Sequence, residues 1–115
     1  MQKELSVIQK MYDLIIWFVP LINKFPRDYK FTLGDRIQNQ MYEILEELIV
    51  AKYEKEKWMR LEKLNAKLDI LRYHTKLLLD FKLIDGKRFY YASILINEIG
   101  IELGGWIKHQ DKIKS

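Results

Sequence analysis

LEKLNAKLDILRYHTKLL, residues 61–78, repeats an apolar or small side chain at spacings that alternate between three and four residues. The repeated positions are Leu61, Leu64, Leu68, Leu71, Thr75 and Leu78. Residues spaced in this way share one side of an α-helix, and the alternation is typical of the seam along which bundled helices pack. We therefore predict a helix over residues 57–84 whose seam faces a bundle core.

The C-terminal half of this predicted helix carries a second apolar flank. Its members are Ile70, Tyr73, Leu77, Phe81 and Ile84. One apolar face is enough to pack against the core of its own bundle, so a second face requires a further neighbour.

Apolar periodicity predicts two more helices on the N-terminal side, over residues 4–23 and 33–54. The first stripe comprises Leu5, Ile8, Tyr12, Ile15 or Ile16, and Val19; the second comprises Ile37, Met41, Leu45 or Ile44, Leu48 and Lys52, which leaves Glu43, Glu46 and Glu47 largely in water. Pro20 lacks a backbone donor, so the first helix should kink or end near it. Thr32 is the expected N-cap of the second, paired with Asp35 in a capping box.

A fourth helix is predicted over residues 86–110. Asp85 is its expected N-cap, and Ile84 and Phe89 are placed to form a hydrophobic staple. One stripe comprises Ala92, Leu95 or Ile96, Ile99, Leu103 and Trp106, and a second comprises Tyr90, Ile94 and Ile101. Gly100, Gly104 and Gly105 are unusual inside a helix, and either a frayed helix end or a close approach between helices explains them.

These helices predict an all-α fold, an antiparallel up-down-up-down four-helix bundle that forms a single domain over residues 1–115. The two doubly apolar helices predict self-association, because large apolar patches seldom stay exposed on a monomer. The alternative is that both flanks are buried inside one bundle.

Composition excludes several classes of protein. The chain has 115 residues and no cysteine, which excludes a disulfide scaffold and fits a reducing cytoplasm. The longest apolar run, residues 14–22, is too short to cross a membrane. Nucleotide-binding and hydrolase motifs are absent, and His74 and His109 have no ligand-spaced partners, so we expect no enzyme activity, no metal and no cofactor.

Positive charge is the more informative feature, although the net charge is only +4. The stretch KFPRDYKFTLGDRI, residues 24–37, and the helix over 57–84 carry the basic residues that we predict to contact nucleic acid or a partner: Arg27, Lys30, Arg36, Arg60, Lys63, Lys67, Arg72 and Lys76. The alternative is that these side chains only solvate helices. Arg72 lies among apolar residues and either pairs with an acid such as Asp69 or binds phosphate or a partner.

The other residues of this stretch are expected to build a corner between two helices. Phe25 and Phe31 should plug the end of the bundle, whereas Tyr29, which lies between basic residues, should meet a partner. Gly34 should allow tight packing.

Three segments of the chain resemble a known family. VIQKMYDLIIWFVPLINKFPRDYKFTLGDRI, LRYHTKLLLDFKLI and ASILINEIGIELGGWIK are similar to segments of the accessory variability determinant proteins of diversity-generating retroelements. These proteins belong with a wider group of four-helix bundles that includes proteins encoded in ribosomal RNA intervening sequences. The resemblance extends over nearly the whole chain.

The resemblance implies a homopentameric barrel of four-helix bundles that catalyses nothing itself. It implies binding to RNA or DNA with little sequence preference and to the retroelement's reverse transcriptase, whose error-prone copying supports mutagenic retrohoming. By motif, Arg72 and Lys76 match the family's basic pair, and Arg27, Lys30 and Arg36 match its basic corner. The alternative is a self-assembling bundle of the intervening-sequence type without a reverse transcriptase partner.

Overall fold

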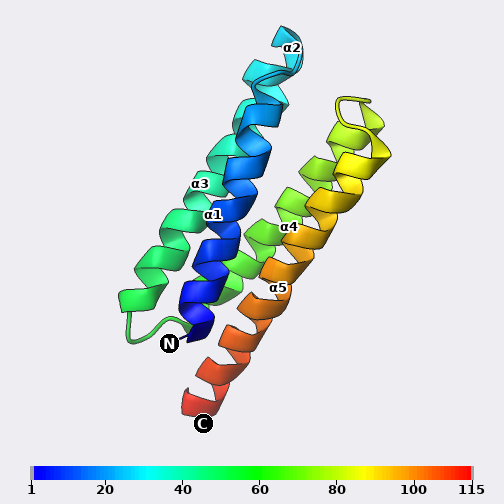
Figure 1. Cartoon of the computed structure of the whole chain (residues 1–115). Coiled ribbons are helices and arrows are strands. Elements are labelled where there is room, and N and C mark those ends of the chain that lie inside the picture. The colour runs from blue at the N-terminus through cyan, green and yellow to red at the C-terminus, as the bar shows by residue number, and fades with distance from the viewer. Residues whose placement is uncertain (1, 115) are drawn as a thin grey trace.

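The computed structural model describes residues 2–114, with side chains over residues 6–110. The elements are α1 (Gln2–Ile22), α2 (Arg27–Tyr29), the π-helix η1 (Lys30–Gly34), α3 (Asp35–Tyr53), α4 (Trp58–Asp80) and α5 (Gly86–Lys114). Because α2, η1 and α3 follow one another without a break, the chain forms four helical rods, and the described part contains no strand (Figure 1). The predicted all-α class is confirmed.

Each rod packs against two neighbours. α1 contacts α3 and α5, and α4 contacts the same two helices. The rods run up, down, up and down in an elongated bundle of 48 × 23 × 20 Å (Figure 1). Within the described part of the chain, no helix is both long and apolar enough to span a membrane.

The predicted core stripes of the last three rods are buried. All six seam residues of α4 are inaccessible to solvent or nearly so. On α5 the stripe is Ala92, Ile96, Ile99, Leu103 and Trp106, so Ile96 and not Leu95 occupies the variable position. On α3, Ile44 is buried in place of Leu45, and Ala51 replaces Lys52 at the end of the stripe.

The stripe predicted for α1 was mostly wrong, because Ile15 is the one buried residue among its described members. The buried residues are Val7, Met11, Leu14, Ile15, Phe18 and Ile22. Tyr12 is half exposed, Ile8 and Val19 are only partly buried, and the side chain of Leu5 lies outside the described residues. Residues 14–22 are apolar on every side, so periodicity alone could not distinguish the face that packs inward.

The first corner differs from the prediction at its start. Helical structure begins at Arg27, because the carbonyl oxygen of Pro26 accepts the Lys30 N–H at 2.8 Å. The Thr32 hydroxyl donates to the carbonyl oxygen of Asp28 at 2.7 Å, so Thr32 lies inside the helical segment and is not the N-cap of α3. No side chain caps α3, because its backbone continues directly from η1.

The turn between α4 and α5 explains why α4 ends at Asp80 and not at residue 84. The Leu83 N–H donates to the carbonyl oxygen of Leu78 at 2.9 Å, and the Lys82 N–H donates to the carbonyl oxygen of Leu79 at 2.9 Å. These two bonds form a Schellman motif, which places Lys82 in the left-handed region at φ 62°. Asp85 then caps α5 as predicted, since its Oδ1 accepts the Arg88 N–H at 2.8 Å.

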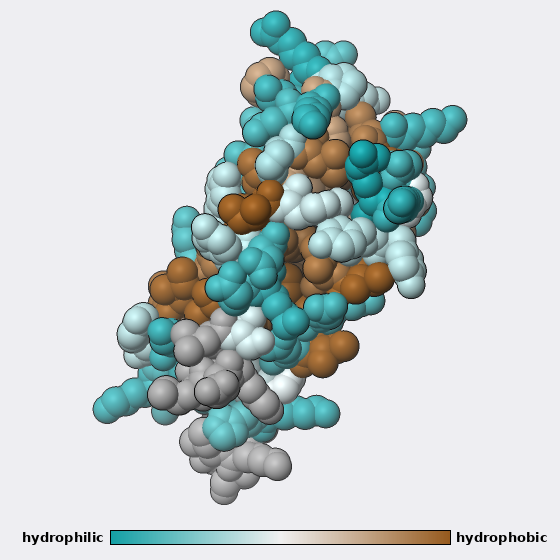
Figure 2. All heavy atoms as spheres, viewed as in Figure 1, coloured by the Kyte–Doolittle hydropathy of each residue, from teal (hydrophilic) through white to brown (hydrophobic). Residues whose placement is uncertain are grey.

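The second apolar flanks of α4 and α5 are exposed in the single chain. On α4 and its C-cap residue they comprise Ile70, Tyr73, Leu77 and Phe81, and on α5 Tyr90, Ile94 and Ile101. Ile84, predicted on the same flank, is instead buried where the turn folds inward. Figure 2 shows hydrophobic side chains reaching the surface between hydrophilic ones on one face of the bundle. The bundle core therefore does not use these flanks.

Candidate nucleic-acid interface

The corner between α1 and α3 is held by close packing around Gly34. A Cβ at this position would lie 3.0 Å from Cγ2 of Ile22 and 3.0 Å from the carbonyl oxygen of Tyr29. The absence of a side chain thus lets η1 cross the end of α1. This packing fixes where the basic residues of the corner project.

The three basic residues of the corner are accessible. Arg27 and Arg36 are exposed and Lys30 is partly exposed, with its Nζ 5.3 Å from the ring centroid of Phe31. That contact is a cation–π arrangement, which aligns the ammonium with an exposed aromatic face.

The aromatic residues of the corner were assigned only partly correctly. Phe25 is 7% exposed and closes the core, as predicted, but Phe31 is 57% exposed. Tyr29, expected to face a partner, is partly buried, and its ring packs on that of Phe81 at a centroid distance of 5.6 Å. Tyr29 ends α2 and Phe31 lies in η1, so the two rings leave adjacent helical segments in different directions.

The contact between Tyr29 and Phe81 joins the corner to the turn between α4 and α5. A groove of about 840 Å³ lies between η1–α3 and α4 and is lined by both rings together with Phe31, Arg36, Asn39 and Gln40. The turn adds three exposed basic residues at the same end of the bundle, Lys82, Lys87 and Arg88 (Figure 1). These were missed in the sequence, although the run Asp85-Gly86-Lys87-Arg88 is visibly basic there.

Arg72 and Lys76 lie on the flank of α4 that faces away from the corner groove, and each has an acidic neighbour. The guanidinium of Arg72 lies 3.5 Å from Asp69 and covers Gly100 of α5, and the ammonium of Lys76 lies 2.8 Å from Asp80. All four side chains are at least one-third exposed. Their carboxylate partners are 62% and 54% exposed, so both pairs are open to solvent and the charges stay available to a polyanion.

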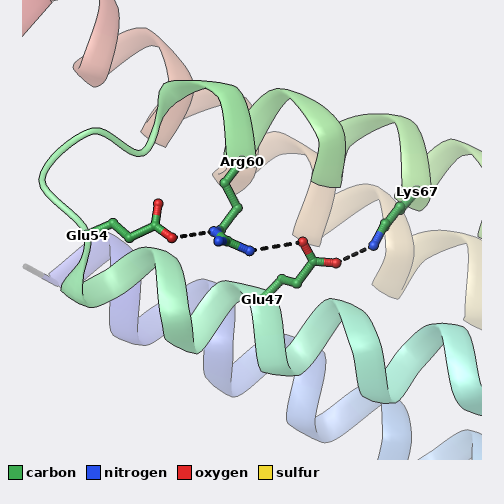
Figure 3. Close-up of polar contacts among 4 residues, drawn as sticks. All are labelled: Glu47, Glu54, Arg60 and Lys67. Atoms are coloured by element: carbon green, nitrogen blue, oxygen red, sulfur yellow. Dashed lines mark hydrogen bonds and ion pairs between the residues drawn. The ribbon is translucent and has the colours of Figure 1, made fainter.

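Of the three basic residues near the N-terminal end of α4, two form ion pairs and one does not. Arg60 lies between two carboxylates, 2.6 Å from Glu54 and 3.3 Å from Glu47, and Lys67 bonds to the second oxygen of Glu47 (Figure 3). Glu47 is therefore not left in water, as the sequence suggested, but connects α3 to α4. Lys63 is exposed and has no ion-pair partner among the described residues. Only Lys63 of these three basic residues carries an unpaired charge.

His74 lies between α4 and α3 beside the corner groove. Its Nδ1 is 2.9 Å from the side-chain amide of Gln40. Burial lowers the pKa of His74, and the charge of Arg36 lowers it further. In the described part of the chain, no group of three or more His, Cys, Asp or Glu side chains is arranged to hold a metal ion.

Comparison with known proteins adds a family. A protein-family model described as bAvd-like matches residues 5–110, nearly the whole chain. This match confirms the resemblance to the accessory variability determinant proteins. Proteins of this type are accessory and non-catalytic and are associated with diversity-generating retroelements. A search of curated proteins found no match.

Proposed function

The chain belongs to the bAvd-like family, and on that premise we propose that it is the nucleic-acid-binding accessory protein of a diversity-generating retroelement. It binds RNA or DNA with little sequence preference and binds the retroelement's reverse transcriptase, so that mutagenic retrohoming proceeds in the cytoplasm. It takes part in this process by binding alone.

One observation carries the proposal: two basic segments far apart in the sequence meet at one end of the bundle. The corner supplies Arg27, Lys30 and Arg36, and the turn between α4 and α5 supplies Lys82, Lys87 and Arg88. Basic side chains gathered at one end of a protein bind the phosphate backbone through sequence-independent, salt-sensitive contacts.

The remaining predicted residues fall into two groups. Arg72, Lys76 and Lys63 are available for such contacts along α4. Arg60 and Lys67 are engaged by Glu47, so they contribute less to binding and more to the joint between α3 and α4.

Self-assembly is the second part of the proposal. The exposed flank of α4, with Ile70, Tyr73 and Leu77, and Ile101 of α5 supply apolar surface for contacts between subunits. Two different faces on one chain suit a closed ring, and we propose the pentamer that the family resemblance implies. Assembly repeats each basic end around the ring and so multiplies the charge presented to nucleic acid.

The alternative is a bundle of the ribosomal RNA intervening-sequence type, which self-assembles but has no reverse transcriptase partner. The exposed apolar flanks alone support it, since they require a second copy and no polymerase. The two proposals differ in a single interaction. Co-purification of the chain with the reverse transcriptase encoded beside it, if one is present, separates them.

The decisive test compares two charge-removal variants in RNA binding at about 50 mM salt. Replacing Arg27, Lys30 and Arg36 by glutamine should weaken binding and flatten its salt dependence, because each lost phosphate contact lowers the slope by about 0.7 for a single strand. The Arg60→Gln, Lys67→Gln double variant is the control, and per charge removed it should change the affinity and the salt dependence much less. Absence of binding by the unaltered chain at low salt would refute nucleic-acid binding, and equal losses in both variants would refute the assignment of the basic end.

A further inference from the structure

A second groove lies on the opposite side of the turn, between α1 and the start of α5. It has a volume of about 680 Å³, and its walls are Trp17, Tyr90, Tyr91 and Ile94, with Lys87 and Arg88 at its charged side. α1 and α5 lie side by side along the bundle (Figure 1), which brings Trp17 next to residues more than 70 positions away in the sequence. The sequence analysis did not predict nucleic-acid contacts for any of these residues, although it placed Tyr90 and Ile94 on an apolar flank.

The aromatic side chains of this groove form an exposed platform. The rings of Trp17 and Tyr91 contact each other at a centroid distance of 5.0 Å and a tilt of 57°, and we call this pair the floor of the groove. Tyr90 is 69% exposed and makes no ring contact with another described residue. A flat ring open to solvent beside a fixed aromatic pair offers a stacking surface for another planar group.

The charge beside the platform is positive. Among the described residues that line the groove, only Asp85 is acidic, and both of its oxygens are engaged by Arg88, one by the backbone N–H and one by the guanidinium at 2.8 Å. Lys87 is exposed and has no such partner in the described part of the chain. An uncompensated ammonium therefore stands within reach of whatever occupies the ring-lined floor.

The basic side of the groove continues past Arg88. A smaller hollow of about 430 Å³, lined by Lys82, Leu21 and Leu83, shares both Asp85 and Arg88 with the aromatic groove. Three basic side chains, Lys87, Arg88 and Lys82, therefore line these two adjoining hollows.

From this arrangement we infer that the Trp17–Tyr90–Tyr91 groove binds a single-stranded polynucleotide, with unpaired bases stacked on Tyr90 and the Trp17–Tyr91 pair and phosphates beside Lys87 and Arg88. Aromatic platforms flanked by basic side chains bind single strands because every base has a face that can stack. A duplex conceals those faces, so the groove selects unpaired segments. The inference rests on the proposed nucleic-acid binding and assigns it a site and a strand preference.

A second copy of the chain is the competing occupant, because Tyr90 and Ile94 share a helix flank with Ile101. The charges favour nucleic acid, because the basic groups at the groove have no unpaired acidic counterpart on their own rim. Ile101 lies more than two helical turns away from Tyr90 and has no basic residue within its own turn, so it stays assigned to subunit contacts.

The test measures binding of a fluorescent oligothymidylate of about 20 nucleotides, the corresponding oligouridylate, and a duplex of the same length. Tyr90→Ala should weaken binding of both single strands about ten-fold, as expected for the loss of one stacked base, and leave duplex binding unchanged. Tyr90→Phe should bind like the unaltered chain. Tyr53→Ala is the matched control: Tyr53 is 77% exposed, lies beside Lys52, and belongs to the opposite end of the bundle.

Tryptophan fluorescence supplies an independent readout. Bases stacked over the floor should quench the emission of Trp17, and Trp17→Phe should abolish the quenching, because Trp106 is buried in the core and Trp58 lies on α4 away from the groove.

The outcomes separate the inference from the proposed function. If the unaltered chain binds none of the probes, both fall. Two results would refute the stacking groove alone while the unaltered chain still binds. In one, Tyr90→Ala binds as tightly as the unaltered chain; in the other, it loses affinity for single strands and for the duplex equally. If Tyr90→Ala changes the number of subunits measured by light scattering but keeps its affinity for single strands, the groove binds a second copy of the chain. That result would likewise overturn the inference.

Discussion

Gly100 of α5 lies directly beneath the guanidinium of Arg72 on α4, so that a Cβ at residue 100 would come within 2.5 Å of the Arg72 Nη2. Of the two explanations open for this glycine, close approach is therefore the one that the structure supports. Gly104 lies one turn further on, where a Cβ would meet no neighbouring atom within 4 Å, so it needs no such explanation.

Gly100→Ala should displace Arg72 without unfolding the bundle. The obstructing atom is the far end of a flexible side chain, so it can swing away, while alanine raises helix propensity by about 1 kcal/mol. Gly104→Ala gains the same propensity and moves nothing, so it is the control. We expect Gly104→Ala to stabilise the protein in urea denaturation by more than Gly100→Ala does. Equal gains would mean that Arg72 does not rest on Gly100 in solution.

Gly34→Ala should lower the free energy of unfolding, whereas Gly104→Ala should raise it. Here the obstructing atoms are the backbone oxygen of Tyr29 and a methyl group of buried Ile22, each 3.0 Å from the new Cβ, and neither can swing away. We expect a loss of about 1–3 kcal/mol, as for other overpacked sites. Thermal denaturation measures it, and an unchanged melting temperature would contradict the packing described for the corner.

Lys82→Gly should stabilise the turn between α4 and α5. Lysine at φ 62° is strained by the contact of its Cβ with the backbone, and glycine relieves about 1 kcal/mol of that strain. Lys82→Ala removes the same charge but keeps the Cβ, so its stability should match that of the unaltered protein. Chemical denaturation of the three proteins decides whether conformation or charge is responsible.

Glu47→Gln should weaken the joint between α3 and α4. The carboxylate contacts both Arg60 and Lys67, and all three side chains are partly exposed, so we expect a loss of about 0.5–1 kcal/mol that shrinks at high salt. Glu46→Gln, an exposed neighbour, serves as control and should change nothing. A loss that persists undiminished at high salt would point to a packing role for Glu47 instead.

His74 should report the charge of Arg36. The pKa of His74 is lowered, first by burial and then by Arg36, so Arg36→Gln should raise it part of the way toward the usual value of about 6.5. Titration of the ring by NMR measures the change. An unaltered pKa in this variant would show that the two side chains are further apart than the structure places them.

The same lowered pKa predicts how stability depends on pH. Below about pH 6.5 the unfolded chain binds a proton at residue 74 before the folded chain does, so unfolding becomes more favourable as the pH falls toward the folded-state pKa. The contribution of neutral His74 to the free energy of unfolding is complete at neutral pH, and it is lost as the pH falls from about 6.5 toward the folded-state pKa. His74→Gln should lack the dependence, as measured by urea denaturation at several pH values above about 5, where carboxylates do not yet titrate.

The sequence by itself determined the four helical rods, most positions of three core stripes, the cap at Asp85 and the family. These follow from local periodicity, since residues three and four apart share a helix face wherever the helix packs. Periodicity failed on α1, where residues 14–22 are apolar on every side. The sequence also misassigned two aromatic residues of the corner, because Tyr29 packs on Phe81 and Phe31 is exposed.

Only the tertiary structure decided which charges are free and which surfaces meet. Whether Arg60 and Lys67 face water or Glu47 depends on the rotation of α4 against α3, which no local pattern encodes. The meeting of Tyr29 with Phe81, and of Trp17 with Tyr91, depends on the order in which the rods pack. Long-range contacts are fixed by the fit of whole helices, so the basic end and its aromatic groove could be located only once the bundle was assembled.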